Sequence, residues 1–130
     1  MVDHNRERSA LVIASSEGKL KTVKTLLQYQ ADPNMQTAGG LTALMIAING
    51  EHPNNEIVEV LLENHADLDI QDERGNTALI MTSERGDYLI VKLLLEKGAK
   101  PSLVNNFQQT ALHKASKGGH LGIAARLRIE

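Results

Sequence analysis

The chain has 130 residues, of which 42% are hydrophobic and only three are aromatic, and its formal net charge is −2. This length suits one domain with a core, and the near-neutral charge gives no attraction to nucleic-acid phosphates or to anionic membranes. Cysteine is absent, which excludes disulfides and thiolate chemistry, and no apolar run approaches the roughly 18 residues of a membrane span. We therefore expect an intracellular chain, cytoplasmic or nuclear, that binds neither nucleic acid nor membrane.

Four copies of one pattern follow one another along the chain. The stretches SALVIASSEG, TALMIAINGE, TALIMTSERG and TALHKASKGG begin at Ser9, Thr42, Thr77 and Thr110, at intervals of 33, 35 and 33 residues. Each opens with a hydroxyl residue that can cap a helix, and leucine follows two places later. Three places beyond each leucine, on the same helical face, stand the small residues Ala14, Ala47, Thr82 and Ala115. This spacing predicts a short helix that packs closely against its neighbours.

A second apolar segment completes each copy. It reads LKTVKTLL, NEIVEVLL, YLIVKLLL and LGIAARLR in chain order, and in the first three copies a polar loop such as QADPN follows it. Helices of eight to ten residues are marginally stable alone because nucleation costs more than so few turns return. The chain therefore reads as helix, turn, helix and loop, repeated four times and stabilised by stacking.

These motifs resemble those of the ankyrin-repeat family over essentially the whole chain. The family's 33-residue period and its T-P-L-H-x-A pattern are similar to GNTALIMTSERGDYLIVKLLLEKGA and QQTALHKASKGGHLGIAARL. The resemblance implies an all-α fold, an ankyrin-repeat solenoid of stacked helix-turn-helix units joined by β-turn loops. We expect a single array over residues 1–130, with repeats at about 5–37, 38–72, 73–105 and 106–130.

The sequence departs from the family pattern at several places. Gln30 and His65 stand where the third repeat has the helix-ending glycine Gly98, so both are expected to take a left-handed conformation or to end the helix differently. The 35-residue interval places two extra residues within 50–56, which we interpret as a tolerated surface insertion, with a partner contact as the alternative. On that interpretation, deletion of Asn54 and Asn55 should leave the fold intact.

The last repeat leaves two readings of the C-terminal end open. Arg128 replaces the second leucine of the repeated LL pair, which suits an end-capping repeat. Leu121, Ile123 and Leu127 are apolar, which favours a chain cut from a longer array. We expect a monomer, with self-association through the C-terminal repeat as the alternative.

No catalytic or metal-binding constellation is present in the sequence. The five histidines show no ligand spacing with a carboxylate partner, and there is neither a G-x-x-x-x-G-K-[ST] loop nor a G-x-S-x-G stretch. We therefore expect no enzyme activity, no cofactor and no metal.

The resemblance implies a protein-interaction module whose partner, a protein or peptide, binds the concave face formed by loop tips and first helices. The family's contact positions lie just before the repeated Thr and seven and eight residues after it. The binding residues expected from those positions are Arg8, Leu41, Asn49, Arg74, Asn76, Glu84, Arg85, Phe107, Gln109 and Lys117. The alternative function is that of a stoichiometric regulator or inhibitor of an enzyme such as a protein kinase.

Overall fold

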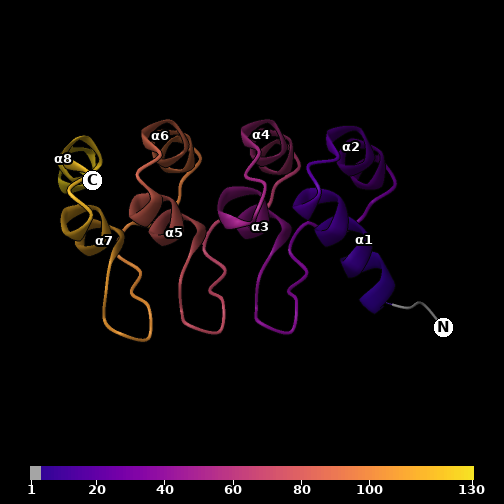
Figure 1. The fold of residues 1–130 in the computed structure, drawn as a ribbon, viewed down its shortest axis with the longest axis horizontal. Helices are drawn as coiled ribbons and strands as arrows, with labels where there is room; N and C mark the ends of the chain where they lie inside the picture. Colours follow the sequence, from indigo (N-terminus) through magenta and orange to yellow (C-terminus); the bar gives the residue numbers. More distant parts are fainter. Residues whose placement is uncertain (1–3) are drawn as a thin grey trace. The chain divides into compact units, whose positions relative to one another are not determined.

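The computed structural model describes the backbone of residues 4–130 and the side chains of residues 10–130. This part of the chain contains eight helices and no strand (Figure 1). The all-α prediction is therefore confirmed. The helices are α1 (His4–Ser16), α2 (Leu20–Gln28), α3 (Ala43–Asn49), α4 (Asn55–Glu63), α5 (Ala78–Arg85), α6 (Tyr88–Glu96), α7 (Ala111–Lys117) and α8 (Leu121–Arg128).

The helices fall into two compact units, residues 1–67 with α1 to α4 and residues 68–130 with α5 to α8. In the first unit α1 packs beside α3 and α2 beside α4, which gives one layer of first helices and one layer of second helices. The second unit repeats this arrangement with α5 beside α7 and α6 beside α8. Each unit thus holds two of the predicted helix-turn-helix repeats.

Each unit has its own aliphatic core. The residues that fill it come from both helix layers and recur at the repeat spacing. In the first unit they include Leu11, Val23, Leu44, Ile57, Val58 and Leu61, and in the second Leu79, Ile80, Val91, Leu94, Ile123 and Leu127. Leu112, the fourth of the aligned leucines, is only half-buried.

The small residues predicted to lie between first helices are all buried. Ala14, Ala47 and Ala115 are at most 4% exposed, and the Thr82 side chain is fully buried. The Thr82 hydroxyl donates a hydrogen bond to the Ala78 carbonyl oxygen at 2.7 Å, so this polar group is satisfied within its own helix. Close packing of the first helices therefore tolerates threonine in place of alanine at this position.

Threonine caps begin three of the first helices, as predicted. The hydroxyl oxygens of Thr42, Thr77 and Thr110 accept a hydrogen bond from the backbone N–H three residues later, each at 3.2 Å. In the first repeat α1 already begins at His4, five residues before Ser9, and the Ser9 side chain lies outside the described residues.

Of the two alternatives that the sequence left open for the ends of the second helices, the structure shows the left-handed conformation after α2 and α4, as at the glycine after α6. The φ angles are 72° at Gln30, 63° at His65 and 97° at Gly98. In the first case the Ala31 N–H donates back to the Leu26 carbonyl oxygen at 3.0 Å, which closes the helix end, and the other two ends repeat this bond. Two repeats therefore accept a strained non-glycine residue at a position where glycine is unstrained.

The extra residues of the second repeat lie before Asn54. The Asn54 side chain accepts a hydrogen bond from the Ile57 N–H at 3.0 Å and is the N-cap of α4, as Asp87 is the N-cap of α6. Asn54 lies twelve residues after Thr42, whereas Asp87 lies ten after Thr77. Deletion of Asn54 and Asn55 would remove this cap, so we expect it to cost about 1 kcal/mol, and the prediction that the fold stays intact remains to be tested.

The C-terminal helix is more buried than the sequence suggests. Ile123 and Leu127 are 2% and 6% exposed within the second unit, whereas Leu121 is 77% exposed. Of the three apolar residues expected to be available for packing, only Leu121 is available.

We predict that Leu79→Ala lowers the free energy of unfolding by about 2 to 5 kcal/mol, because it empties a fully buried site in α5. Chemical denaturation measures this change. Leu89→Ala in α6 is the matched control, and its effect should stay within about 0.5 kcal/mol because Leu89 is exposed. Equal effects of the two substitutions would show that the core is assigned wrongly.

We also predict that deletion of Glu51 and His52, both exposed, changes the free energy of unfolding by less than about 1 kcal/mol, since shortening a loop by two residues alters its closure entropy little. Asn54→Ala should cost about 1 kcal/mol through loss of the cap. Urea titration measures the free energy of unfolding of both variants. A larger loss of stability in the deletion variant than in Asn54→Ala would contradict this placement of the insertion.

Candidate functional site

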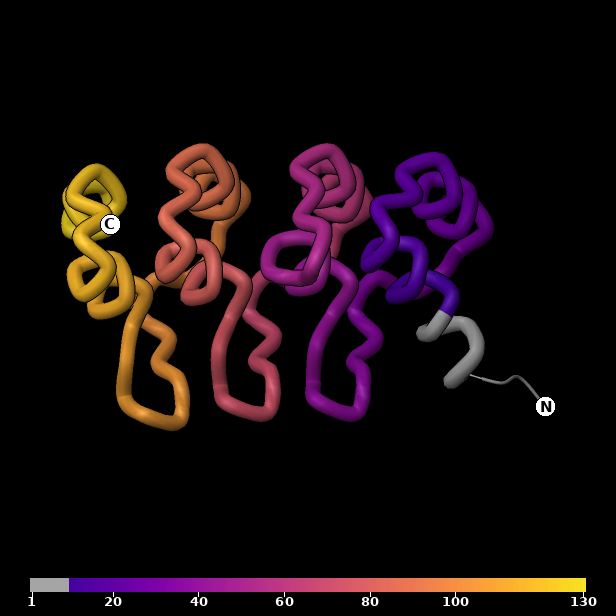
Figure 2. The backbone as a smooth tube through the Cα atoms, in the orientation of Figure 1, coloured from indigo at the N-terminus to yellow at the C-terminus, as the bar shows by residue number. Residues whose placement is uncertain are grey.

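The loops that precede α3, α5 and α7 project from these helices as narrow hairpins (Figure 2). In the loop before α5, the Asp72 carboxylate accepts hydrogen bonds from the backbone N–H groups of Arg74 and Asn76, at 2.9 and 2.8 Å. Gly75 takes the left-handed conformation at the turn, with φ of 80°. The loop before α5 therefore has a defined tip at residues 72–76.

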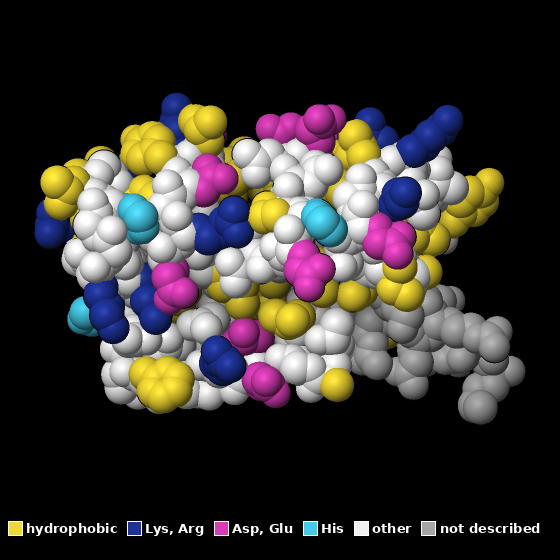
Figure 3. Space-filling view, in the orientation of Figure 1, with side chains coloured by type: hydrophobic (Ala, Val, Ile, Leu, Met, Phe, Trp, Pro, Cys, Tyr) yellow, Lys and Arg dark blue, Asp and Glu magenta, His cyan; other side chains and the backbone are white. Residues whose placement is uncertain are grey.

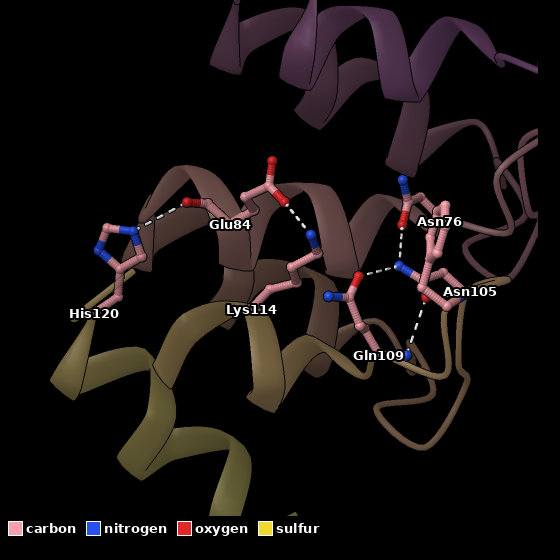
Figure 4. Close-up of polar contacts among 7 residues, drawn as sticks. Asn76, Glu84, Asn105, Gln109, Lys114 and His120 are labelled. Atoms are coloured by element: carbon pink, nitrogen blue, oxygen red, sulfur yellow. Dashed lines mark hydrogen bonds and ion pairs between the residues drawn. The ribbon is translucent and has the colours of Figure 1, made fainter. Parts of the chain in front are cut away.

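The loop before α7 builds the same tip with an amide in place of the carboxylate. Asn105 lies 33 residues after Asp72, and its side-chain oxygen accepts hydrogen bonds from the N–H groups of Phe107 and Gln109, at 2.9 and 3.0 Å. Its side-chain nitrogen donates to the side-chain oxygens of Asn76 at 2.9 Å and Gln109 at 3.0 Å (Figure 4). Asn105 is 3% exposed and uses both its donors and both its acceptor sites.

Phe107 is the residue that this tip presents. Its side chain is 71% exposed, although an aromatic side chain gains most from burial. The next residue, Gln108, has φ of 61° and takes the left-handed place that Gly75 takes in the neighbouring tip. A strained residue and a buried amide thus hold Phe107 away from the core, which is a feature typical of functional surfaces.

The two tips of the second unit are joined. The Asn106 N–H donates to the Arg74 carbonyl oxygen and its side chain donates to the Glu73 carbonyl oxygen, both at 2.9 Å. A Cβ atom on Gly75 would lie 2.6 Å from the Asn106 side-chain oxygen, so glycine also makes room for this contact. Arg74 and Phe107 are consequently exposed on adjoining, mutually braced loops.

Beyond the tips, the site continues over α5 and α7. Lys114 Nζ lies 2.7 Å from Glu84 Oε2, and His120 Nε2 lies 3.0 Å from the Glu84 carbonyl oxygen (Figure 4). Since a carbonyl oxygen only accepts, His120 donates from Nε2. Arg85 and Lys117 are exposed in the last turns of their helices, a position where the helix dipole favours cations.

Seven of the ten expected binding residues therefore lie on the tips and first helices of the second unit. Five are exposed and two, Asn76 and Gln109, are half-buried partners of Asn105. In the first unit Leu41 is half-buried and Asn49 is exposed at the end of α3. The Arg8 side chain lies outside the described residues.

Sequence reasoning missed Asn105, Lys114 and His120. The 33-residue register was a usable signal for Asn105, because it aligns this residue with the turn-forming Asp72. His120 likewise aligns with the N-cap residue Asp87. Lys114 carried no such signal, since its role depends on the position of Glu84 in a neighbouring helix.

Charge is distributed unevenly between the two halves of the sequence. Residues 68–130 carry nine Lys or Arg and seven Asp or Glu, whereas residues 1–67 carry five and nine. Acidic and basic side chains alternate over the face drawn in Figure 3, without a large field of one sign. The second unit is therefore the more attractive one for an acidic ligand.

In the part of the chain that the structure describes, no group of three or more His, Asp or Glu residues is placed to hold a metal ion. None of the helices described has the length and apolar character that crossing a membrane demands.

We predict that Asn105→Ala lowers the free energy of unfolding by about 1 to 3 kcal/mol, because it leaves two backbone N–H groups and two side-chain oxygens without their partner. Phe107→Ala on the same tip should change it by less than about 0.5 kcal/mol. Thermal or urea unfolding compares the two variants, and equal stability of Asn105→Ala and the native chain would rule out the supporting role of Asn105.

Comparison with known proteins shows what the chain is similar to. The family model described as ankyrin repeats, three copies, matches residues 1–72 and 51–129. The chain is 35% identical over 107 residues to human transient receptor potential cation channel subfamily A member 1, which covers 82% of the chain and 9% of the channel.

Two further relatives come from a nematode and a virus. The chain is 34% identical over 121 residues to the ankyrin repeat and KH domain-containing protein CBG24701 of Caenorhabditis briggsae, covering 92% of the chain and 4% of that protein. It is 34% identical over 110 residues to putative ankyrin repeat protein FPV031 of fowlpox virus, covering 82% of the chain and 32% of that protein. The chain thus spans less than a third of each of these relatives.

Proposed function

Because the chain belongs to the ankyrin-repeat family, whose repeats generally serve as protein-protein interaction modules, we propose that it is a non-catalytic module that binds a protein or peptide. The proposed binding face consists, within each unit, of the loop tips and first helices. In the first unit it includes Arg8, Leu41 and Asn49, and in the second unit Arg74, Asn76, Glu84, Arg85, Phe107, Gln109 and Lys117.

The exposure of Phe107 is the observation that carries the proposal. An aromatic side chain on a fixed loop loses little conformational entropy on binding and buries a large apolar area, which is what binding hot spots supply. The buried Asn105 amide and its four hydrogen bonds fix this loop before any partner arrives. The tip is thereby preorganised for contact with an apolar side chain of the partner.

The charges around Phe107 favour a partner with an acidic stretch. The exposed cations Arg74, Arg85 and Lys117 outnumber the one exposed carboxylate of the tips, Glu73. The Glu84 carboxylate is already paired with Lys114. Arginine on an exposed surface binds carboxylates in a bidentate manner. A peptide with one large apolar residue and neighbouring Asp or Glu therefore complements the second unit.

Affinity capture from cell lysate with mass spectrometry tests the proposal. The native chain is compared with the triple variant Phe107→Ala, Arg74→Glu, Arg85→Glu after its fold has been checked by circular dichroism. We expect a protein retained by the native chain to fall at least about tenfold with the variant, because an aromatic anchor and two arginines are removed.

A matched control variant makes the same kinds of change elsewhere. Tyr29→Ala, Lys21→Glu, Lys24→Glu also removes one exposed aromatic ring and reverses two exposed cations, but on α2 and its C-cap. Its capture should equal that of the native chain. Equal capture by all three proteins would place the binding site away from the loop tips and first helices.

A further inference from the structure

The outer surface of the second helices differs between the two units. Three places in each second helix, or directly after it, are exposed in every repeat, and each place can be compared across the four copies at the repeat spacing. In α2 they hold Lys21, Lys24 and Gln28, in α4 Glu56, Glu59 and Glu63, in α6 Leu89, Lys92 and Glu96, and in the last repeat Gly122 and Ala125 of α8 and its C-cap residue Ile129. The first unit is polar at all six places, whereas the second unit has apolar or small residues at four of six.

These residues belong to a larger apolar face on α6 and α8. We define the outer apolar face as Tyr88, Leu89, Leu121 and Ile129, whose exposed fractions are 43%, 70%, 77% and 77%. Helices α6 and α8 pack side by side, and Figure 3 shows hydrophobic side chains over both. Half of the large apolar side chains that are exposed in the described chain lie on this face.

Tyr88 connects the two helices across a glycine. A Cβ atom on Gly122 would lie 3.7 Å from Tyr88 Cδ2, so the ring reaches from α6 to the first turn of α8. Ala125, one turn further along, is also small and exposed. The large side chains are thus arranged around small ones, which allows the backbone of a partner element to approach closely.

The charges on these helices indicate the kind of partner. Together α6 and α8 carry the cations Lys92, Arg126 and Arg128 and the single anion Glu96, and Arg126 pairs with Glu130 at 3.3 Å. A second copy of the chain would bring the same excess of positive charge to this face. Its acidic helix α4 offers Glu56, Glu59 and Glu63 but no exposed large apolar side chain. Self-association therefore fits the face poorly.

We propose that the outer apolar face binds an amphipathic α-helix of a partner protein, with apolar residues on one side and acidic residues along its borders. The face extends from the first turn of α6 and α8 to Ile129, about 12 Å along α8 at 1.5 Å per residue, which corresponds to roughly two turns of a bound helix. This site is separate from the binding face built around Phe107, which lies on a loop tip.

Fluorescence anisotropy with a dye-labelled synthetic peptide tests the inference. The probe has about 16 residues, with leucines at i, i+3, i+4 and i+7 on one face and glutamates on both borders. We expect saturable binding to the native chain, at least about tenfold weaker binding to Leu89→Glu and weaker binding to Lys92→Glu, because the first variant places a charge in the apolar contact and the second reverses the complementary charge.

The controls separate this site from the one around Phe107. Lys21→Glu occupies the place in α2 that Leu89 occupies in α6 and should bind the peptide as the native chain does, as should Phe107→Ala. A peptide with lysine in place of every glutamate should bind at least about tenfold more weakly. Amide chemical-shift changes in the native chain should be confined to α6 and α8.

Several outcomes would overturn the inference. They are an absence of saturable binding to the native chain, loss of binding in Phe107→Ala, equal binding of the lysine peptide, and shift changes on the loop tips. Sedimentation measurements showing a dimer that Leu89→Glu dissociates would assign the face to a second copy instead. Native-chain binding to anionic vesicles that Leu89→Glu abolishes would assign it to a lipid surface.

Discussion

The close contact between neighbouring first helices is the interaction on which each unit depends. The helices α3, α5 and α7 have only seven or eight residues, too few to be stable in water by themselves. Buried small residues, Ala47 in the first unit and Ala115 in the second, let such helices approach a neighbour closely enough for the aliphatic side chains around them to pack. The loops then extend from a layer of helices that is held by packing, and their tips can present side chains without contributing to the core.

Repetition made most of the fold predictable. Threonine occupies the N-cap of three first helices because the same hydrogen bond is needed at the same place in each repeat, so alignment of the copies was sufficient to find it. The left-handed conformations of Gln30 and His65 followed from their alignment with Gly98. In both cases the structural requirement is local and recurs every 33 to 35 residues, which a single sequence can show.

Features that depend on contacts between different side chains were not predictable in this way. The loop that carries Phe107 is supported by Asn105, whose partners include Asn76 in the preceding loop. The role of Asn54 as the N-cap of α4 was not predictable because the sequence does not show which residues of the 50–56 segment form the loop and which begin the helix. The burial of Ile123 and Leu127 likewise depends on how α8 packs against α7 and α6. For the candidate site, the repeat register located the exposed positions, whereas the residues that support them emerged only from the folded arrangement.

The position of Asn54 has a consequence for how such a chain can vary. The two additional residues are accommodated before the cap, and from Asn54 onward Ile57 and Leu61 are buried at the same phase of the helix as Ile90 and Leu94 in α6. In this repeat the cap therefore fixes where the helical register begins, and a length change upstream of it does not alter the packing downstream. The length of the loop is therefore independent of the spacing of the buried residues. Residues can be added to the loop of one repeat without changing which side chains its helix packs into the core.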